Sequence, residues 1–137
     1  MSERVLVVTY GSLRTGMQNF RVNERAGGVS IGEGFTEQPA LLSRYGGAYF
    51  PVVSLDPEHA KGKIRVEVFE TTQDGLEGPY DSLEGYPNFY NRTKIPVILD
   101  SGETVEGWIY HIDDLGCHGE TVESCDWKNF HLNNGRE

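Results

Sequence analysis

The stretch RTKIPVILDSGETVEGWIYHID, residues 92–113, contains two strand-like runs on either side of a turn sequence. The runs cover residues 92–100 and 103–113. Asp100-Ser101-Gly102 lies between them and has the composition of a tight turn. Two such runs joined by a short turn predict a β-hairpin. We therefore expect the chain to build its fold around β-sheet.

Further runs along the chain also have the composition of strands. In residues 63–71, Ile64, Val66 and Val68 alternate with charged or polar neighbours, which is typical of a half-buried strand. The remaining runs are β-rich and are separated by glycine or proline; they cover residues 4–10, 29–36, 40–45 and 49–55. The sequence thus predicts about seven short strands.

Two short helices accompany these strands, at residues 17–26 and 79–85. Many short strands with few helices predict an α+β fold, namely a small mixed β-barrel of about six to seven strands with short flanking helices. We expect residues 1–113 to carry this domain. The polar residues 114–137 have no clear period and are interpreted as an extension of the same domain, either a helical turn or a loosely attached tail.

The 137-residue chain is acidic, with 21 Asp and Glu against 12 Lys and Arg and a formal net charge of −9. Such a surface repels phosphate backbones and anionic lipids, so we expect neither nucleic-acid nor membrane binding. Apolar runs such as VLVV, residues 5–8, are too short to span a membrane, and the N-terminus does not read as a secretory signal. These features predict a cytoplasmic protein with reduced cysteines. Nothing in the pattern indicates an oligomeric state.

The motif Leu-Glu-Gly occurs twice, around Glu77 and around Glu84. Pro79 suits the first turn of a helix and Gly85 suits its end, so the predicted helix contains Glu84 and leaves Glu77 in a solvated loop. The helix dipole and the neighbouring tyrosines are expected to raise the pKa of Glu84. A carboxyl of this kind is suited to general acid–base chemistry, whereas the alternative is an ordinary surface glutamate.

Several potential metal ligands are concentrated near the C-terminus: His111, Cys117, His118, Cys125 and His131. A zinc site is conceivable from these side chains, but their spacing contains neither a C-x₂-C nor an H-x₃-H pair. We therefore expect no metal. The glycine-rich stretch GGVSIGEG, residues 27–34, neither follows a clear strand nor opens a helix, so it does not qualify as a phosphate-binding loop.

Two segments in this order, VTYGSLRTGMQN (8–19) and DSLEGYPNFYNRTKIPVIL (81–99), resemble the gamma-glutamylcyclotransferase-like family. A strand that ends in Tyr-Gly-Ser-Leu is followed by Leu-Glu-Gly-Tyr, then by a tyrosine, an arginine and another strand. The segments at 42–55 and 103–112 also resemble the family, so the similarity covers residues 4–113. The resemblance implies a small mixed β-barrel with flanking helices.

The resemblance also implies a reaction, in which a gamma-glutamyl amine or gamma-glutamyl amino acid cyclises to 5-oxoproline and releases the free amine without a metal or cofactor. The catalytic general acid/base would be Glu84. The substrate-binding loop would consist of Tyr10, Gly11, Ser12 and Leu13. A glycine-containing turn of this kind brings backbone N–H groups close to an anion. Tyr90 is a further candidate for the pocket and equally a candidate for the core.

Two other interpretations stay open. The domain could be a non-catalytic module that binds a small metabolite or a partner protein, although such a module has no need of a carboxyl at Glu84. Arg92 could line the pocket, but pairing with a surface acid or opening the next strand is the favoured role. Residues 45–51, YGGAYFP, are expected to form a bend that could shape one pocket wall.

Overall fold

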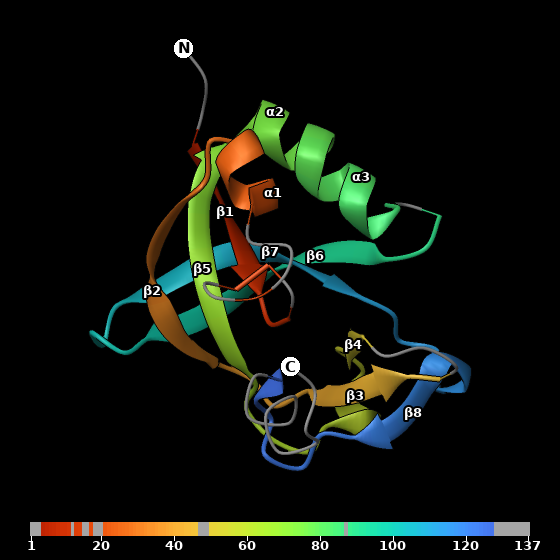
Figure 1. Cartoon of the computed structure of the whole chain (residues 1–137). Helices are drawn as coiled ribbons and strands as arrows, with labels where there is room; N and C mark the ends of the chain where they lie inside the picture. Colours follow the sequence, from red (N-terminus) through yellow and green to blue (C-terminus); the bar gives the residue numbers. More distant parts are fainter. Residues whose placement is uncertain are drawn as a thin grey trace.

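The computed structural model describes residues 4–11, 13, 14, 17, 21–46, 50–86 and 88–127. Within these ranges the chain forms two β-sheets and a group of short helices, which lie at one end of the larger sheet (Figure 1). None of the helices in the described ranges is long and apolar enough to cross a membrane.

The larger sheet is a closed barrel with the strand order β1-β5-β2-β6-β7 (Figure 1). Its strands are β1 (Arg4–Thr9), β2 (Val29–Thr36), β5 (Arg65–Thr72), β6 (Asn91–Leu99) and β7 (Thr104–His111). Neighbouring strands are antiparallel except β1 and β7, which pair in parallel through Val7 and Val8. Closure removes the exposed edges that an open sheet would have.

The hairpin predicted from residues 92–113 is confirmed as β6 and β7. Their Cα register runs from Asn91 opposite His111 to Ile98 opposite Thr104. In the turn, Gly102 has a φ of 95°, a left-handed conformation that favours glycine.

The smaller sheet has three strands in the order β4-β3-β8. They are β3 (Leu41–Tyr45), β4 (Pro51–Ser54) and β8 (His118–Thr121). The predicted α+β class and mixed barrel are confirmed. The expected barrel of six to seven strands is wrong in number, since the barrel has five strands. The strands expected at residues 40–45 and 49–55 form β3 and β4 of the second sheet, because β3 pairs with β4 and with β8, a strand that was not expected.

The segment after residue 113 is packed into the fold as far as residue 127. The short 3-10 turn η3 (Leu115–Cys117) leads into β8, and Val122 and Trp127 are only 1% and 2% exposed. Of the two expectations for this segment, the helical turn is confirmed at residues 115–117, and the loosely attached tail is wrong for residues 114–127. Two well-separated apolar side chains hold this segment without creating a periodic pattern. The division of the chain at residue 113 stays a prediction.

Three short helices follow one another between β5 and β6: α2 (Gln73–Gly75), the π-helical turn η2 (Leu76–Tyr80) and α3 (Asp81–Glu84). The helix expected to begin at Pro79 begins earlier, so Glu77 is helical and the expected loop is wrong. Proline lacks an N–H and clashes with the preceding turn of an α-helix. The wider π-turn at this point accommodates Pro79 inside a continuous helical segment.

The other helices are short. They are α1 (Arg21–Arg25), which covers part of the expected helix at 17–26, and the 3-10 turn η1 (Pro57–His59). Residues 18–20 of that expected helix lie outside the described residues. Helix α1 packs against η2 through the buried Asn23, whose carbonyl side-chain oxygen accepts a hydrogen bond from the Tyr80 hydroxyl.

Both faces of the central strands are buried. Val8 belongs to a core cluster that also contains Val66, Val68 and Ile109, whereas the adjacent Val7 belongs to a second cluster with residues of the helical segment. The alternation in β5 predicted a half-buried strand, and this prediction is wrong. Glu67 and Phe69, on the face expected to be exposed, are only 4% and 1% exposed. The helical segment thus packs directly on β1, where the candidate loop begins.

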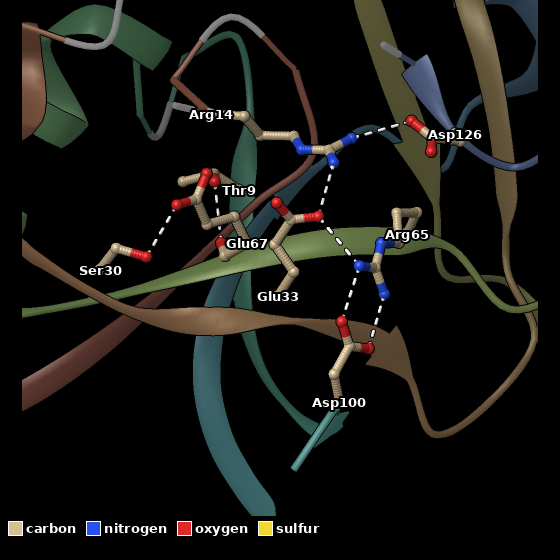
Figure 2. A network of polar contacts seen from close by, with 8 residues as sticks. All are labelled: Thr9, Arg14, Ser30, Glu33, Arg65, Glu67, Asp100 and Asp126. Atoms are coloured by element: carbon tan, nitrogen blue, oxygen red, sulfur yellow. Dashed lines mark hydrogen bonds and ion pairs between the residues drawn. The ribbon is translucent and has the colours of Figure 1, made fainter. Parts of the chain in front are cut away.

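A network of ion pairs fixes the segment that follows β1 (Figure 2). The buried Arg14 contacts Asp126 at 2.9 Å and Glu33 at 3.2 Å. Glu33 also contacts Arg65 at 3.0 Å, and Arg65 pairs with Asp100. The network joins the segment after β1 to β2, to β5, to the β6–β7 turn and to the C-terminal segment.

Candidate active site

One cavity of about 420 Å³ lies where the end of β1, the end of α3 and strand β7 come together. It is lined by aromatic, aliphatic and a few polar residues: Val8, Thr9, Tyr10, Gly11, Leu13, Phe50, Pro51, Leu83, Glu84, Phe89, Tyr90 and Tyr110. A cavity of this size and largely apolar character is typical of a small-molecule site.

The residues singled out from the sequence meet in this cavity. Tyr10, Gly11, Leu13, Glu84 and Tyr90 all line it, although the loop and the glutamate are far apart in the chain. Ser12 lies outside the described residues. The geometry brings these side chains together, and their roles in substrate binding and catalysis stay predictions.

The end of α3 places Glu84 at the cavity. Gly85 follows with a φ of 69°, and its backbone N–H donates to the carbonyl of Asp81. This is the glycine-terminated helix end that the sequence predicted. The chain then turns away from the helix axis, and Glu84 remains on the last turn with its side chain against the cavity.

The carboxyl of Glu84 is partly buried and makes no hydrogen bond or ion pair with another described residue. Burial raises its pKa from the ordinary 4.5 to about 7. Loss of hydration penalises the charged form, and no side chain in the described ranges offsets this penalty with a hydrogen bond or an ion pair. Glu77, by contrast, is exposed and accepts a hydrogen bond from the Gln73 side chain at 2.8 Å. Of the two Leu-Glu-Gly glutamates, only Glu84 faces the cavity.

Three tyrosines surround Glu84. The hydroxyl of Tyr10 donates to the carbonyl of Tyr110, and the hydroxyl of Tyr90 donates to the carbonyl of Pro51, both at 2.7 Å. Burial raises the pKa of Tyr10, Tyr90 and Tyr110, and the negative charge of Glu84 raises each further. These tyrosines are neutral at physiological pH and hold their rings in fixed positions around the carboxyl.

A buried ion pair lies behind the pocket tyrosines. Asp81 accepts a hydrogen bond from the Tyr110 hydroxyl at 2.5 Å and pairs with Arg92 at 3.0 Å. The guanidinium of Arg92 also lies over the rings of Tyr86 and Trp108, at 4.4 and 4.7 Å from their centroids. Arg92 does pair with an acid near the start of β6, but the expectation of a surface acid is wrong, because Asp81 is buried.

Sequence reasoning did not identify Asp81 or Tyr110. The available signal was the spacing of Asp81 and Glu84, which are three residues apart and therefore neighbours on a helix. The hydroxyl of Tyr110 reaches Asp81 from strand β7, a contact that depends on the barrel closing. It therefore could not be read from the local sequence.

The loop after β1 turns tightly at Gly11. The backbone N–H of Arg14 donates to the carbonyl of Gly11 at 3.0 Å. A Cβ atom at Gly11 would collide with the ring of Pro51, so only glycine fits this position. The close approach in the structure is to Pro51. The expected approach of backbone N–H groups to an anion stays a prediction. Thr9, immediately before the loop, is held by its hydroxyl on the carbonyl of Glu67 at 2.8 Å.

Residues 50 and 51 form part of the cavity wall, as expected for the bend at 45–51, of which residues 47–49 lie outside the described residues. Phe50 stacks on Tyr45 with ring centroids 4.6 Å apart. Phe89 lies 6.0 Å from Phe50 and meets Tyr90 edge-on at 5.1 Å. The wall of the cavity on this side is therefore a cluster of contacting aromatic rings.

Among the described residues, no group of three or more His, Cys, Asp or Glu side chains could hold a metal ion. The histidines near the C-terminus have other contacts. His111 contacts Thr93 at 2.7 Å and Asp113 at 2.8 Å, and His118 contacts Ser43 at 2.9 Å. His131 lies outside the described residues.

Comparison of the sequence with known proteins identifies the family of this chain. The model of the family described as gamma-glutamyl cyclotransferase, AIG2-like, matches residues 7–129. A proposed gamma-glutamylcyclotransferase of Methanocaldococcus jannaschii is 34% identical over 125 residues, which cover 90% of this chain and 96% of that protein. A proposed gamma-glutamylcyclotransferase of Drosophila melanogaster is 30% identical over 118 residues, or 82% of this chain and 71% of that protein.

A solved structure has the same fold. The crystal structure of an AIG2-like protein from Mus musculus superposes with a TM-score of 0.72 at 22% identity, and the match covers 80% of this chain and 78% of that one. The resemblance seen in residues 4–113 is thus confirmed. The chain belongs to the AIG2-like gamma-glutamylcyclotransferase family.

Proposed function

We propose that this chain is a cyclotransferase that converts a gamma-glutamyl amine or gamma-glutamyl amino acid to 5-oxoproline and the free amine. One observation carries the proposal: the carboxyl of Glu84 lies without a hydrogen-bonding partner, among the described residues, in a small cavity that also contains Tyr10, Gly11 and Leu13. Family membership supports the same reaction class. We also propose a cytoplasmic location, which is the default expectation from the sequence.

In this reaction the substrate's α-nitrogen attacks its own γ-carbonyl carbon. The nitrogen begins as an ammonium ion and must lose a proton before it can attack. Glu84, whose pKa is about 7, is suited to accept that proton near neutral pH. The tetrahedral intermediate then expels the amine as the bond between the γ-carbonyl carbon and the leaving nitrogen breaks. Glu84 returns its proton to the leaving nitrogen, and the second proton of the attacking nitrogen passes to the departing amine, which leaves as an ammonium ion. The ring nitrogen of 5-oxoproline keeps one hydrogen, and no nucleophile of the protein is consumed.

The loop would supply the second requirement, which is to hold a flexible glutamyl chain in a folded shape. Gly11 lines the cavity, and we expect backbone N–H groups of its turn to bind the α-carboxylate or the developing oxyanion. Fixing the reacting atoms removes rotational entropy from the barrier, an effect worth up to about 7–11 kcal/mol in well-oriented reactions. The rigid attachment of Arg14 to Glu33 and Asp126 supports this role.

The test is to incubate the wild-type protein with a panel of gamma-glutamyl amines, gamma-glutamyl amino acids and glutathione, and to identify the products by mass spectrometry. Release of 5-oxoproline with a stoichiometric amount of amine would support the proposal. Release of free glutamate would indicate hydrolysis by water and contradict it. Tight binding of a panel member without turnover would favour the non-catalytic binding module.

A further inference from the structure

We propose that the leaving group of the substrate is an apolar amine, preferably an aromatic one, that carries no carboxylate. This inference rests on the proposed function and concerns the part of the cavity that the glutamyl group leaves free. If the glutamyl group is held by the loop that contains Gly11, then the leaving nitrogen lies at Glu84. The substituent on that nitrogen then points to the mouth of the cavity.

Exposed apolar side chains line the mouth of the cavity. Leu83 is 40% exposed and Phe89 is 43% exposed, and both line the cavity beside the partly buried Phe50. Leu83 occupies the helix position just before Glu84, so the apolar surface begins next to the carboxyl. Scattered apolar side chains on a surface need no explanation, whereas several around one cavity indicate a contact surface for a ligand.

The aromatic wall at this mouth is already assembled. Phe89 contacts the rings of Tyr45 and Phe50 at centroid distances of 5.4 and 6.0 Å, and it meets Tyr90 at 5.1 Å. Rings held by other rings lose little further freedom when a ligand binds, so less binding free energy is spent on ordering them. Edge-to-face contacts with another ring are favourable in such a cluster.

The charge of the cavity disfavours a carboxylate on the leaving group. Among the described lining residues the carboxyl of Glu84 is the one acidic group, and none is Lys, Arg or His. The internal positions outside the described ranges also contain no Lys, Arg or His in the sequence. The neighbouring Arg92 is paired with Asp81. A second carboxylate at the mouth would therefore lose hydration without a cationic partner and lie close to Glu84.

A matched pair of substrates tests this inference. Gamma-glutamyl-phenethylamine and gamma-glutamyl-phenylalanine differ by one carboxylate. A third compound, gamma-glutamyl-methylamine, has neither the carboxylate nor the aromatic ring. We expect kcat/KM for the phenethylamine compound to exceed that of each of the other two by about tenfold or more, the scale of discrimination that an apolar pocket achieves. Equal or better turnover of the phenylalanine compound would overturn the inference.

Two variants at exposed positions test separately the aromatic wall of the mouth and its lack of a cationic side chain. Phe89→Ala should lower kcat/KM more for the phenethylamine compound than for the methylamine compound, so their ratio falls toward one. Leu83→Lys should raise kcat/KM for the phenylalanine compound relative to that for the phenethylamine compound, because the lysine supplies a cation for the carboxylate. Unchanged ratios in both variants would contradict the proposed role of the mouth.

The outcomes also distinguish the inference from the proposed function. Release of 5-oxoproline from all three compounds at similar efficiency would keep the cyclotransferase and overturn the specificity. Absence of 5-oxoproline from every compound, the methylamine compound included, would reject the cyclotransferase itself, and the inference would fall with it.

Discussion

Glu84 and Asp100 carry the same functional group in opposite surroundings. Glu84 lies at the apolar cavity without a hydrogen-bonding partner in the described part of the chain, and burial raises its pKa to about 7. Asp100 lies in the network of Figure 2, where its hydrogen bonds with Arg65 lower its pKa below the ordinary value of 3.8. The surroundings, and not the residue type, place the pKa of one carboxyl near neutral pH and keep the other carboxyl charged.

Asp81 is instructive because it is buried like Glu84 and paired like Asp100. It lies one helical turn before Glu84, but Arg92 and the Tyr110 hydroxyl both contact it. A buried carboxylate with a guanidinium partner is a structural element, whereas a buried carboxyl without one is available for chemistry. Each of the following predictions alters one side of this comparison.

The largest effect is expected from Glu84→Gln. The amide keeps the shape of the side chain but cannot accept a proton, so the rate of 5-oxoproline release should fall by about 10²–10⁴-fold. Glu77→Gln is the matched control, because it makes the same change in the other Leu-Glu-Gly motif at an exposed position and should retain wild-type activity. Equal rates for wild type and Glu84→Gln would move the proton transfer to another group.

The next largest effect is expected from separating Asp81 and Arg92. Arg92→Gln leaves the buried carboxylate of Asp81 without its cation, which should lower the free energy of unfolding by about 3 kcal/mol in urea titrations. The double variant Asp81→Asn with Arg92→Gln removes both charges and should recover much of this loss. A single-variant loss below about 1 kcal/mol would show that the pair behaves as a surface ion pair.

A smaller effect concerns the dependence of stability on pH. The folded-state pKa of Glu84 is raised above its unfolded value, so the fold favours the protonated form. The wild type should therefore lose stability relative to Glu84→Gln as the pH rises from about 4.5 to about 7, and the difference should be constant above that range. Chemical denaturation at several pH values measures this difference. A difference that does not change over this interval would contradict the raised pKa.

The smallest effect is expected from Asp100→Asn. Because Asp100 is an exposed partner of Arg65, the variant should change the denaturation midpoint only slightly, and the change should diminish at high salt. A large, salt-independent loss of stability would show that the network of Figure 2 carries more of the fold than the comparison assumes.

The local parts of the fold could be predicted from the sequence. Short β-rich runs bounded by glycine or proline indicated most of the strands, Asp100-Ser101-Gly102 indicated the β6–β7 turn, and Gly85 indicated the helix end that positions Glu84. These features depend on residues close together in the chain. The loop and the glutamate that line the pocket could also be identified from the sequence, because each belongs to a short motif that resembles the family.

The long-range parts could not be predicted. The pairing of β3 with β8 and the burial of Trp127 join segments far apart in the sequence, so the strands divided into two sheets. The π-turn at Pro79 depends on how the whole helical segment packs. The aromatic mouth around Phe50 and Phe89 combines two loops that show no common pattern in the sequence.

The most direct test of the central claim is a titration of Glu84 and Asp100 in the same sample. The side-chain carboxyl carbons of uniformly ¹³C-labelled protein can be followed by NMR against pH, with Glu84→Gln and Asp100→Asn providing the assignments. We predict that Glu84 titrates near pH 7 and that Asp100 titrates below its ordinary value. Titration of Glu84 near 4.5 would contradict the account, because its carboxyl would then be an ordinary surface acid.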